Sequence, residues 1–410
     1  MVTDANDDLS RDLKRAGRRR RMAALGLVAP LFLFLLFSFV LPIGDMLRRS
    51  VADAEVTDTW PSAARMLRRW DREKEPDEAM FAVFGRDVRK SAEERSIAIA
   101  ARRLNYALPG GRSLVMNAGR ALRELKGEPA SWRDALVSED PAWAERKTWI
   151  ALAHAAGPFT DFYLLTAFDL ERDAEDGISL RPPEQSLYLA VLQRTIFVSA
   201  SVTLLCLVIG FPLAYFVANA PPARANLLMI LVLLPLWTSL LVRSAAWIVL
   251  LQDQGIINGF LQWTGLISEP IRLIFNRPGV VIAMTHVQLP FMILPIIATM
   301  KAIPQSYMRA AVSLGAHPAV AFWRVYLPQT LPGVAAGTLL VFIMSLGYYV
   351  TPALVGGASD QMLAYFIAFN TTSTANWGLA AALGVLLLGA TAILYFVYSR
   401  LAGMGQAKLG

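Results

Sequence analysis

The chain has 410 residues, of which 55% are hydrophobic and 17% are charged, with a mean hydropathy of +0.44 and a formal net charge of +7. Soluble domains carry about a quarter charged residues, so this composition excludes a chain that is exposed to water over most of its length. The only cysteine is Cys206, which excludes an internal disulfide, a zinc site built from cysteines and an iron–sulfur cluster.

Charged residues are unevenly distributed along the chain. Residues 45–186 carry 22 basic and 25 acidic side chains, as a water-soluble domain would, whereas residues 187–410 carry 10 basic and 3 acidic ones. Long uncharged runs fill the second segment, and each is long enough for the roughly 20 helical residues that cross a bilayer core. The sequence therefore predicts an all-α integral membrane protein. Its six transmembrane helices are expected at roughly 22–44, 187–219, 226–251, 278–300, 333–352 and 377–400.

The first hydrophobic run, at 22–44, has two interpretations. A cleaved signal peptide fits the arginines at 18–21 and the loose cleavage-site pattern at 52–54. However, the apolar stretch is about twice as long as a signal-peptide core, and Arg48 and Arg49 come before the pattern. We therefore expect an uncleaved membrane anchor.

Basic residues of short loops predict the orientation, because such residues are enriched on the cytoplasmic side. Six spans place three basic segments on one side of the membrane: the arginines at 18–21, the loop at 301–331 and Arg400. The three acidic residues after residue 186 lie on the opposite side. We therefore expect cytoplasmic tails at 1–21 and 404–410. Because the arginine cluster adjoins a membrane helix, we expect no nucleic-acid partner.

Residues 45–186 are then expected to form an extracytoplasmic insertion between the first two spans. Apolar residues at three- and four-residue steps predict helices there, at 64–72, 78–88, 93–106, 113–125 and 142–154. Large apolar side chains are usually buried, so we place five tryptophans in the core of this insertion rather than on a binding surface: Trp60, Trp70, Trp132, Trp143 and Trp149.

The loop at 301–331 has the most informative pattern. Residues 305–314 predict a short helix with small residues on one face, and Gly315 suits the left-handed conformation that ends a helix. Pro318 suits the first turn of a second helix, and Pro328 is expected to break that helix ahead of the fifth span. A short helix parallel to the membrane suits docking into a cleft of another protein.

The spacing resembles the EAA loop of permease subunits in binding-protein-dependent ABC importers, where Glu-Ala-Ala is followed by three residues, Gly, nine residues and Ile-x-Leu-Pro. The residues in register are Ala310, Ala311, Gly315, Leu327 and Pro328, with Val325 at the Ile position. Arg309 stands where the family usually has Glu, which puts in question any ion pair between that Glu and an ATPase.

Neighbouring segments resemble the PotB-like, spermidine/putrescine branch of these permeases. The similar segments are 210–215, 235–243 with 255–258, and 289–295. The resemblance covers 22–44 loosely and a permease core at 187–403 closely. The insertion at 45–186 departs from the short loop of this branch. It is expected to contact a solute-binding protein or cover the external gate, although a passive decoration is an alternative.

The resemblance implies the type I permease architecture of ABC importers in the bacterial inner membrane. Two permeases, the second PotC-like, would form the pore; two cytoplasmic ATPases would clamp the coupling loops, and a periplasmic solute-binding protein would deliver cargo. The chain has no Gly-x₄-Gly-Lys-Ser/Thr loop for phosphates. We therefore expect no enzyme activity and no cofactor in this chain, with ATP–Mg bound by the partner ATPase and lipid around the spans.

Five residues are candidates for the transport pathway: Trp237, Arg243, Gln288, Tyr348 and Tyr349. An ionisable residue within a span is a functional candidate, but Arg243 also fits a side chain that extends to the outer interface. Aromatic residues near span ends are also common interfacial anchors. The three histidines are scattered, so we expect no metal site.

A polyamine-like cargo is the first hypothesis for the transported solute. A polyamine cation favours carboxylates or aromatic faces along its route, and the permease core offers only Asp253, Glu269 and Asp360, all near the outer face. Iron, thiamine, an anion or an amino-acid derivative are alternatives. A sensory receptor and a secondary transporter are alternatives of other classes; the latter is disfavoured because buried acid–base pairs are missing.

Overall fold

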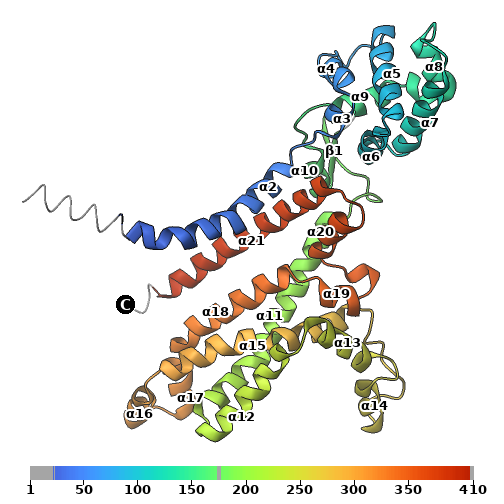
Figure 1. The fold of residues 1–410 in the computed structure, drawn as a ribbon. Coiled ribbons are helices and arrows are strands. Elements are labelled where there is room, and N and C mark those ends of the chain that lie inside the picture. The colour runs from blue at the N-terminus through green and yellow to red at the C-terminus, as the bar shows by residue number, and fades with distance from the viewer. Residues whose placement is uncertain (1–21, 23, 173–176, 407–410) are drawn as a thin grey trace, which may run out of the picture.

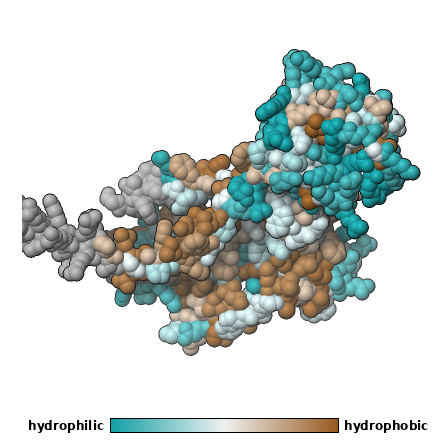
Figure 2. Space-filling view, turned by 45° about the horizontal axis from the view of Figure 1, so that its top comes forward, coloured by the Kyte–Doolittle hydropathy of each residue, from teal (hydrophilic) through white to brown (hydrophobic). Residues whose placement is uncertain are grey.

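The computed structural model describes residues 22, 24–172 and 177–406, and it is almost entirely helical. Six of the described helices are long and apolar enough to cross a membrane: Ala24–Arg49, Tyr188–Asn219, Leu240–Trp263, Arg277–Ala302, Pro318–Leu346 and Trp377–Arg400. Apolar side chains cover the spans, whereas hydrophilic ones cover the insertion (Figure 2). The predicted all-α membrane fold with six spans is confirmed. The predicted tail at 1–21 lies outside the described residues.

The first, second, fourth and sixth spans lie close to their predicted positions, and three short elements connect the fifth span to the sixth. The first span contains a π-helical turn at Leu36–Val40 and ends with α2 (Leu41–Arg49). The second and fourth spans are α11 (Tyr188–Asn219) and α15 (Arg277–Ala302), and the sixth is α21 (Trp377–Gln406), all within a few residues of their predicted positions. Between the fifth and sixth spans lie α19 (Val350–Val355), a 3₁₀ turn (Ala358–Asp360) and α20 (Leu363–Thr372).

The third span was predicted as one helix at 226–251, and this prediction is wrong. The segment consists of α12 (Pro222–Leu233), a 3₁₀ turn (Leu234–Trp237), α13 (Leu240–Leu251) and α14 (Ile256–Trp263). Pro235 lies in the 3₁₀ turn, where its missing N–H weakens the α-helical hydrogen bonding, and Thr238 and Ser239 are extended. The Ser239 hydroxyl then accepts a hydrogen bond from the Val242 N–H at 3.2 Å and begins α13.

The fifth span was predicted at 333–352, preceded by a break at Pro328, and both expectations are wrong. Helix α17 (Pro318–Ala321) continues through a π-helical turn (Phe322–Tyr326) into α18 (Leu327–Leu346). Because a π turn interrupts the ordinary i→i−4 hydrogen bonding, Pro328 is accommodated at the start of α18. Pro332 lies inside α18, as neighbouring helices allow in membranes.

Helices α11, α15 and α18 form the centre of the membrane bundle. Gly333 and Gly337 permit close approach of α18 to α15, because a Cβ on Gly333 would overlap Thr299 and one on Gly337 would lie 2.9 Å from the Met292 carbonyl oxygen. Small residues at such spacing are typical of membrane helix contacts. Helix α2 packs along α21 at one side of this bundle (Figure 1).

The insertion lies at one end of the bundle (Figure 1) and has two parts. We call residues 54–157 the lobe; its helices are α3 (Glu55–Thr59), α4 (Pro61–Leu67), α5 (Glu78–Glu93), α6 (Ile97–Ala107), α7 (Gly111–Glu124), α8 (Trp132–Glu139) and α9 (Arg146–Ala155), with a 3₁₀ turn at Pro141–Ala144. The five predicted helices are confirmed with shifted ends, and α3 and α8 were not predicted.

The lobe has its own hydrophobic core, which is rich in tryptophan. Trp60, Trp143 and Trp149 are fully buried around Phe84, whose ring centroid lies 5.0–5.2 Å from theirs. Trp132 is also buried, while Trp70 is half-buried against the same cluster. The prediction that these tryptophans belong to the core is confirmed.

We call residues 158–187 the base of the insertion. It contains α10 (Phe162–Ala167) and an antiparallel hairpin of β1 (Leu170–Arg172) and β2 (Ile178–Leu180), with Leu170 opposite Leu180. The sequence predicted neither. The base packs on the membrane helices: Tyr163 and Ala167 share a core with residues of α11, α20 and α21, and a Cβ on Gly378 would overlap the Tyr163 ring. Burial raises the pKa of the Tyr163 phenol, which therefore stays neutral in this apolar setting.

The chain enters and leaves the lobe at one place. Ala52 and Phe159 form an antiparallel bridge. The Thr160 N–H donates to the Val51 carbonyl at 2.7 Å, and the Asp53 N–H donates to the Pro158 carbonyl at 3.1 Å. The cleavage-site pattern at 52–54 is therefore part of a folded junction, which favours the interpretation of the first span as an anchor.

Asp169 fixes the base to the second span. Its carboxylate is buried and accepts hydrogen bonds from the N–H groups of residues 187 and 188 at 3.0 Å and of residue 189 at 2.8 Å. These N–H groups lie at the start of α11, where a helix leaves donors without partners and favours negative charge. The base and the second span are thus joined by a buried charged cap.

Candidate functional site

The predicted loop helix lies at the end of the bundle opposite to the insertion (Figure 1). Helix α16 (Gln305–Ser313) ends at Gly315, which has φ +87°, the left-handed conformation that glycine adopts without strain. Two backbone hydrogen bonds close the turn, from Gly315 N–H to Val312 and from Ala316 N–H to Ala311. Pro318 begins α17, and the His317 ring nitrogen caps it by accepting from Ala319 N–H at 3.3 Å.

None of the nine residues of α16 is buried. The exposed apolar side chains of this region are Tyr307, Val312, Leu314, Val320 and Trp323. Lys301, Arg309 and Arg324 are also exposed, and residues 301–331 contain no acidic residue. We call this combination of exposed apolar and basic side chains the coupling surface. Within the described residues, Arg309 has no ion-pair partner.

The remaining residues of the predicted loop differ in exposure. Ala310 is exposed and Ala311 is half-buried in α16, while Leu327 and Pro328 are half-buried at the start of α18. The structure therefore brings Arg309, Ala310 and Ala311 together on one helix and separates them from Leu327 and Pro328, which join the loop to the fifth span.

Aromatic contacts tie the coupling surface to the second span. The Tyr215 ring on α11 meets the rings of Phe322 and Tyr326, each at a centroid distance of 5.5 Å, and those two stack at 5.8 Å. A cavity of about 380 Å³ lies beside them, under α16, with Arg309, Met308 and Tyr326 in its wall. The segment between α16 and α18 thus contacts α11 and continues into α18.

The predicted pathway residues are only partly brought together. Gln288 is fully buried, and its side-chain oxygen accepts a hydrogen bond from the Ser345 hydroxyl at 3.1 Å. Arg243 is half-buried, with Nε and Nη1 enclosed and without a partner in the described part of the chain. The Tyr348 hydroxyl is also buried and makes no hydrogen bond with the described residues.

The other two pathway candidates lie elsewhere. Trp237 is 72% exposed and Tyr349 is also exposed, as expected of residues that face lipid or a partner chain. Arg243 is half-buried, and its two interpretations, a pathway residue and a side chain that extends to the outer interface, both stay predictions. A transport role of these residues stays a prediction.

Sequence reasoning missed an ion pair at the insertion end of the bundle. Asp360 is buried, and Arg277 Nε donates to its Oδ1 at 3.3 Å. Arg194 Nη1 donates to the Gln361 carbonyl at 3.1 Å, so α11, α15 and the 3₁₀ turn at Ala358–Asp360 meet here. The signal in the sequence is the position of Arg277 directly before an uncharged run. Asp253 and Glu269, the other carboxylates of the core, are exposed.

The six spans and the exposed loop helix at one end of the bundle are the arrangement expected of a transport permease from the resemblance. A family model described as "binding-protein-dependent transport system inner membrane component" matches residues 210–403. The spermidine/putrescine transport system permease protein PotB of Escherichia coli (strain K12) is 32% identical over 223 residues, 54% of this chain and 81% of the relative. PotB of Haemophilus influenzae is 36% identical over 214 residues, 52% of this chain and 75% of the relative.

The chain belongs to the family of binding-protein-dependent transport system inner membrane components. It is a permease subunit of an ABC importer and a multi-pass protein of the inner membrane, and its predicted resemblance to the PotB-like branch is confirmed. The insertion lies outside the matched residues 210–403.

Other proteins are similar over shorter segments or at lower identity. The molybdenum transport system permease protein ModB of Mycobacterium bovis is 33% identical over 151 residues, 37% of this chain and 55% of the relative. A solved bacterial alginate ABC transporter, in complex with a periplasmic protein that holds an alginate pentasaccharide, is 16% identical, with a TM-score of 0.45, over 52% of this chain and 78% of that chain.

Proposed function

We propose that the chain forms one half of the membrane pore of a polyamine importer. A second, PotC-like permease supplies the other half, and two ATPase subunits bind the coupling loops of the two permeases. A periplasmic binding protein delivers a polyamine at the insertion end. The observation that carries this proposal is the coupling surface, an unburied loop helix with apolar and basic side chains, at the opposite end from the insertion.

In this proposal the chain itself is not an enzyme, and ATP–Mg is bound and hydrolysed by the partner ATPases. Closure of the ATPases displaces α16. The displacement reaches α18 because the helix is continuous from Pro318, and it reaches α11 through the Tyr215 cluster. Both termini and the coupling surface face the cytoplasm, and the insertion faces the periplasm.

The polyamine cargo is supported by the two PotB relatives. A cation binds best to carboxylates and aromatic faces, yet Asp360 is held by Arg277 and the other two core carboxylates are exposed outside the bundle. We infer that the binding protein and the second permease select the cargo, because this chain offers it no free carboxylate within the described part of the bundle.

An anionic cargo is the second candidate, because Arg243 has enclosed nitrogen atoms without partners among the described residues. A buried, unpaired charge is costly, and an anion passing the bundle would pair with it. The similarity to ModB, a molybdenum transport permease, agrees with this alternative.

Purification and uptake together test the proposal. A tagged chain extracted from its native membrane in mild detergent is expected to retain an ATPase and a second six-span permease in near-equal amounts. Cells that lack the chain are expected to lose uptake of labelled putrescine and spermidine. Unchanged polyamine uptake would reject the cargo, and loss of molybdate uptake instead would favour the anion. A chain that purifies alone even after crosslinking contradicts the importer assembly.

We also propose that the lobe contacts the periplasmic binding protein. Because the chain enters and leaves the lobe through the bridge between Ala52 and Phe159, residues 55–156 can be replaced by a short Gly-Ser linker while the base stays in place. We expect this variant to reach the membrane and retain its ATPase, but to lose stimulation of uptake by the binding protein. Stimulation that survives intact means that the lobe is a passive decoration.

A further inference from the structure

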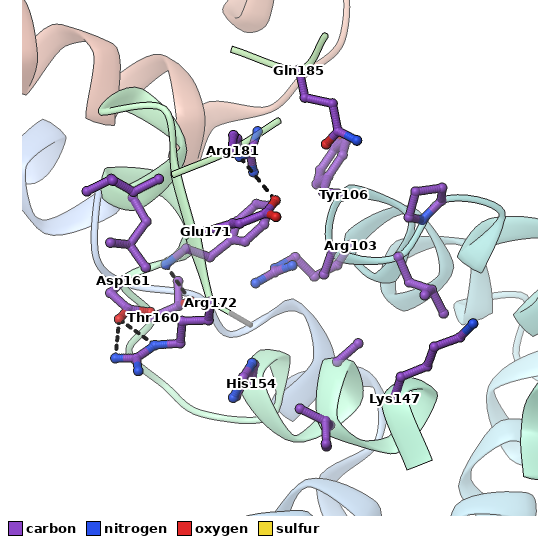
Figure 3. A pocket seen from close by; sticks show the side chains of 18 residues that line it. Arg103, Tyr106, Lys147, His154, Thr160, Asp161, Glu171, Arg172, Arg181 and Gln185 are labelled. Carbon is purple, nitrogen blue, oxygen red and sulfur yellow. Dashed lines mark hydrogen bonds and ion pairs between the residues drawn. The ribbon is translucent and has the colours of Figure 1, made fainter. Parts of the chain in front are cut away.

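A cavity of about 380 Å³ lies between the lobe and the base of the insertion (Figure 3). Helices α6 and α9 form its wall on the lobe side, and α10, β1 and the segment before α11 form its wall on the base side. The elements that line the cavity, α6, α9, α10 and β1, lie at the insertion end of the molecule, away from α16 (Figure 1). Neither the proposed transport route nor the ATPase contact uses it.

Arg103 connects the two walls. Its Nε pairs with Asp53 in a contact that is buried on both sides, and its guanidinium carbon lies 4.6 Å from the ring centroid of Phe162 in the base. One of its two terminal nitrogens, Nη1, is buried and has no hydrogen-bond partner among the described residues. Figure 3 shows the side chain extending from α6 into the cavity.

Arg181, in the base, also has a buried guanidinium nitrogen without a hydrogen-bond partner among the described residues. Its Nη2 donates to the Thr166 hydroxyl at 2.9 Å. Its Nε is enclosed and lies 3.9 Å from Glu171 Oε2, too far for a hydrogen bond. Two arginines on opposite walls therefore each have a buried N–H group without an acceptor, which is costly for a charged group unless something accepts from it.

The rest of the described lining adds further hydrogen-bond donors, and its basic side chains are held in ion pairs. Among the described residues, four basic side chains and two acidic ones, Asp161 and Glu171, line the cavity, and one of the basic ones, Lys147, pairs with Glu145 at 2.6 Å. Asp161 is already held by Arg172 at 2.6 Å. Tyr106 adds a hydroxyl that burial keeps protonated, since its pKa is raised. The lining thus supplies donors that match an anionic oxygen group.

We propose that this cavity binds a small molecule that carries an anionic oxygen group, a carboxylate or a phosphate, held by Arg103 from the lobe and Arg181 from the base. Guanidinium groups pair with such oxyanions through strong, charge-assisted hydrogen bonds. The volume is at the lower end of small-molecule sites. Because the ligand contacts both walls, its binding fixes the lobe against the base. The site does not depend on which cargo the permease moves.

Binding to the purified full-length chain in lipid nanodiscs tests this proposal, with succinate, inorganic phosphate and putrescine as separate probes. We expect calorimetric binding and a raised thermal midpoint with succinate or phosphate, and neither with putrescine. Succinate alone identifies a carboxylate site, and phosphate alone identifies a phosphate site. Hydrogen exchange in α6 and α10 is expected to slow with the bound anion.

Two variants and a matched control locate the binding. Arg181→Gln removes one charge-assisted hydrogen bond and is expected to weaken anion binding about tenfold or more. Ala151→Phe fills the cavity without changing its charge and is expected to abolish binding. Arg86→Gln, an exposed arginine of the lobe paired with Glu128, is expected to bind as the unmodified chain does. If neither anion binds, if putrescine binds instead, or if binding survives Ala151→Phe, the proposal is wrong.

Discussion

Leu314→Asp is expected to abolish binding-protein-dependent uptake and to remove the ATPase from the purified complex. Leu314 is 89% exposed at the end of α16, so its replacement costs the isolated chain little. Burying a leucine in an interface contributes about 1.5–3 kcal/mol, and a buried, unpaired carboxylate costs more. The association with the ATPase should therefore weaken at least about 100-fold. Quantifying the co-purified ATPase and measuring uptake in cells checks both effects.

Leu266→Asp is the matched control for this variant. Leu266 is 71% exposed and lies in the loop that we place on the periplasmic side, so ATPase binding should be unchanged. Leu314→Asn removes the apolar contact without adding a charge. Its recovery of the ATPase should lie between the recovery with Leu314→Asp and that with Leu266→Asp. Normal ATPase recovery with Leu314→Asp would mean that the coupling surface does not dock as proposed.

Asp169→Ala is expected to lower the free energy of unfolding by about 2–4 kcal/mol, because three N–H groups at the start of α11 lose a charged acceptor. Asp169 also has φ +54°, which alanine adopts less readily than aspartate or asparagine. Asp169→Asn keeps one acceptor oxygen and the backbone preference, so its effect should be smaller. Thermal unfolding in detergent and hydrogen exchange at the amides of residues 187–189 measure the change.

Glu128→Ala serves as the control for this series. Glu128 forms an exposed ion pair with Arg86 at 2.9 Å, and such pairs contribute about 0–1 kcal/mol. If Asp169→Ala is no more destabilising than Glu128→Ala, the carboxylate is not the link between the insertion and the second span.

The sequence predicts the membrane fold well because hydrocarbon tolerates almost no charge, so uncharged runs mark the spans directly. The sequence does not predict helix ends correctly where those ends depend on contacts with other helices. Pro328 and Pro332 are strong helix breakers in isolation, but a π-helical turn and packing against α15 accommodate them in α18. Conversely, Thr238 and Ser239 interrupt a run that is apolar enough to be one helix.

In the candidate sites too, the sequence predicts features that depend on neighbouring residues in the chain, but not contacts between residues far apart in it. The turn at Gly315 and the start of α17 at Pro318 follow from local backbone preferences, and both are confirmed. The Asp169 cap on α11 joins residues 18–20 positions apart, and the ion pair of Arg277 with Asp360 joins residues 83 positions apart. Such contacts exist only once the helices are packed, so residue spacing carries no signal for them.

The continuous fifth span also has a mechanical consequence. Twenty-nine residues from Pro318 to Leu346 make a rod of about 43 Å at roughly 1.5 Å per residue. A tilt of only about 5° at its coupling end would sweep the far end through about 4 Å, more than the diameter of a water molecule. Ser345, which holds Gln288, lies at that far end. Under the proposed function, a small rotation imposed by a bound ATPase at the coupling end would be magnified at Ser345 and Gln288.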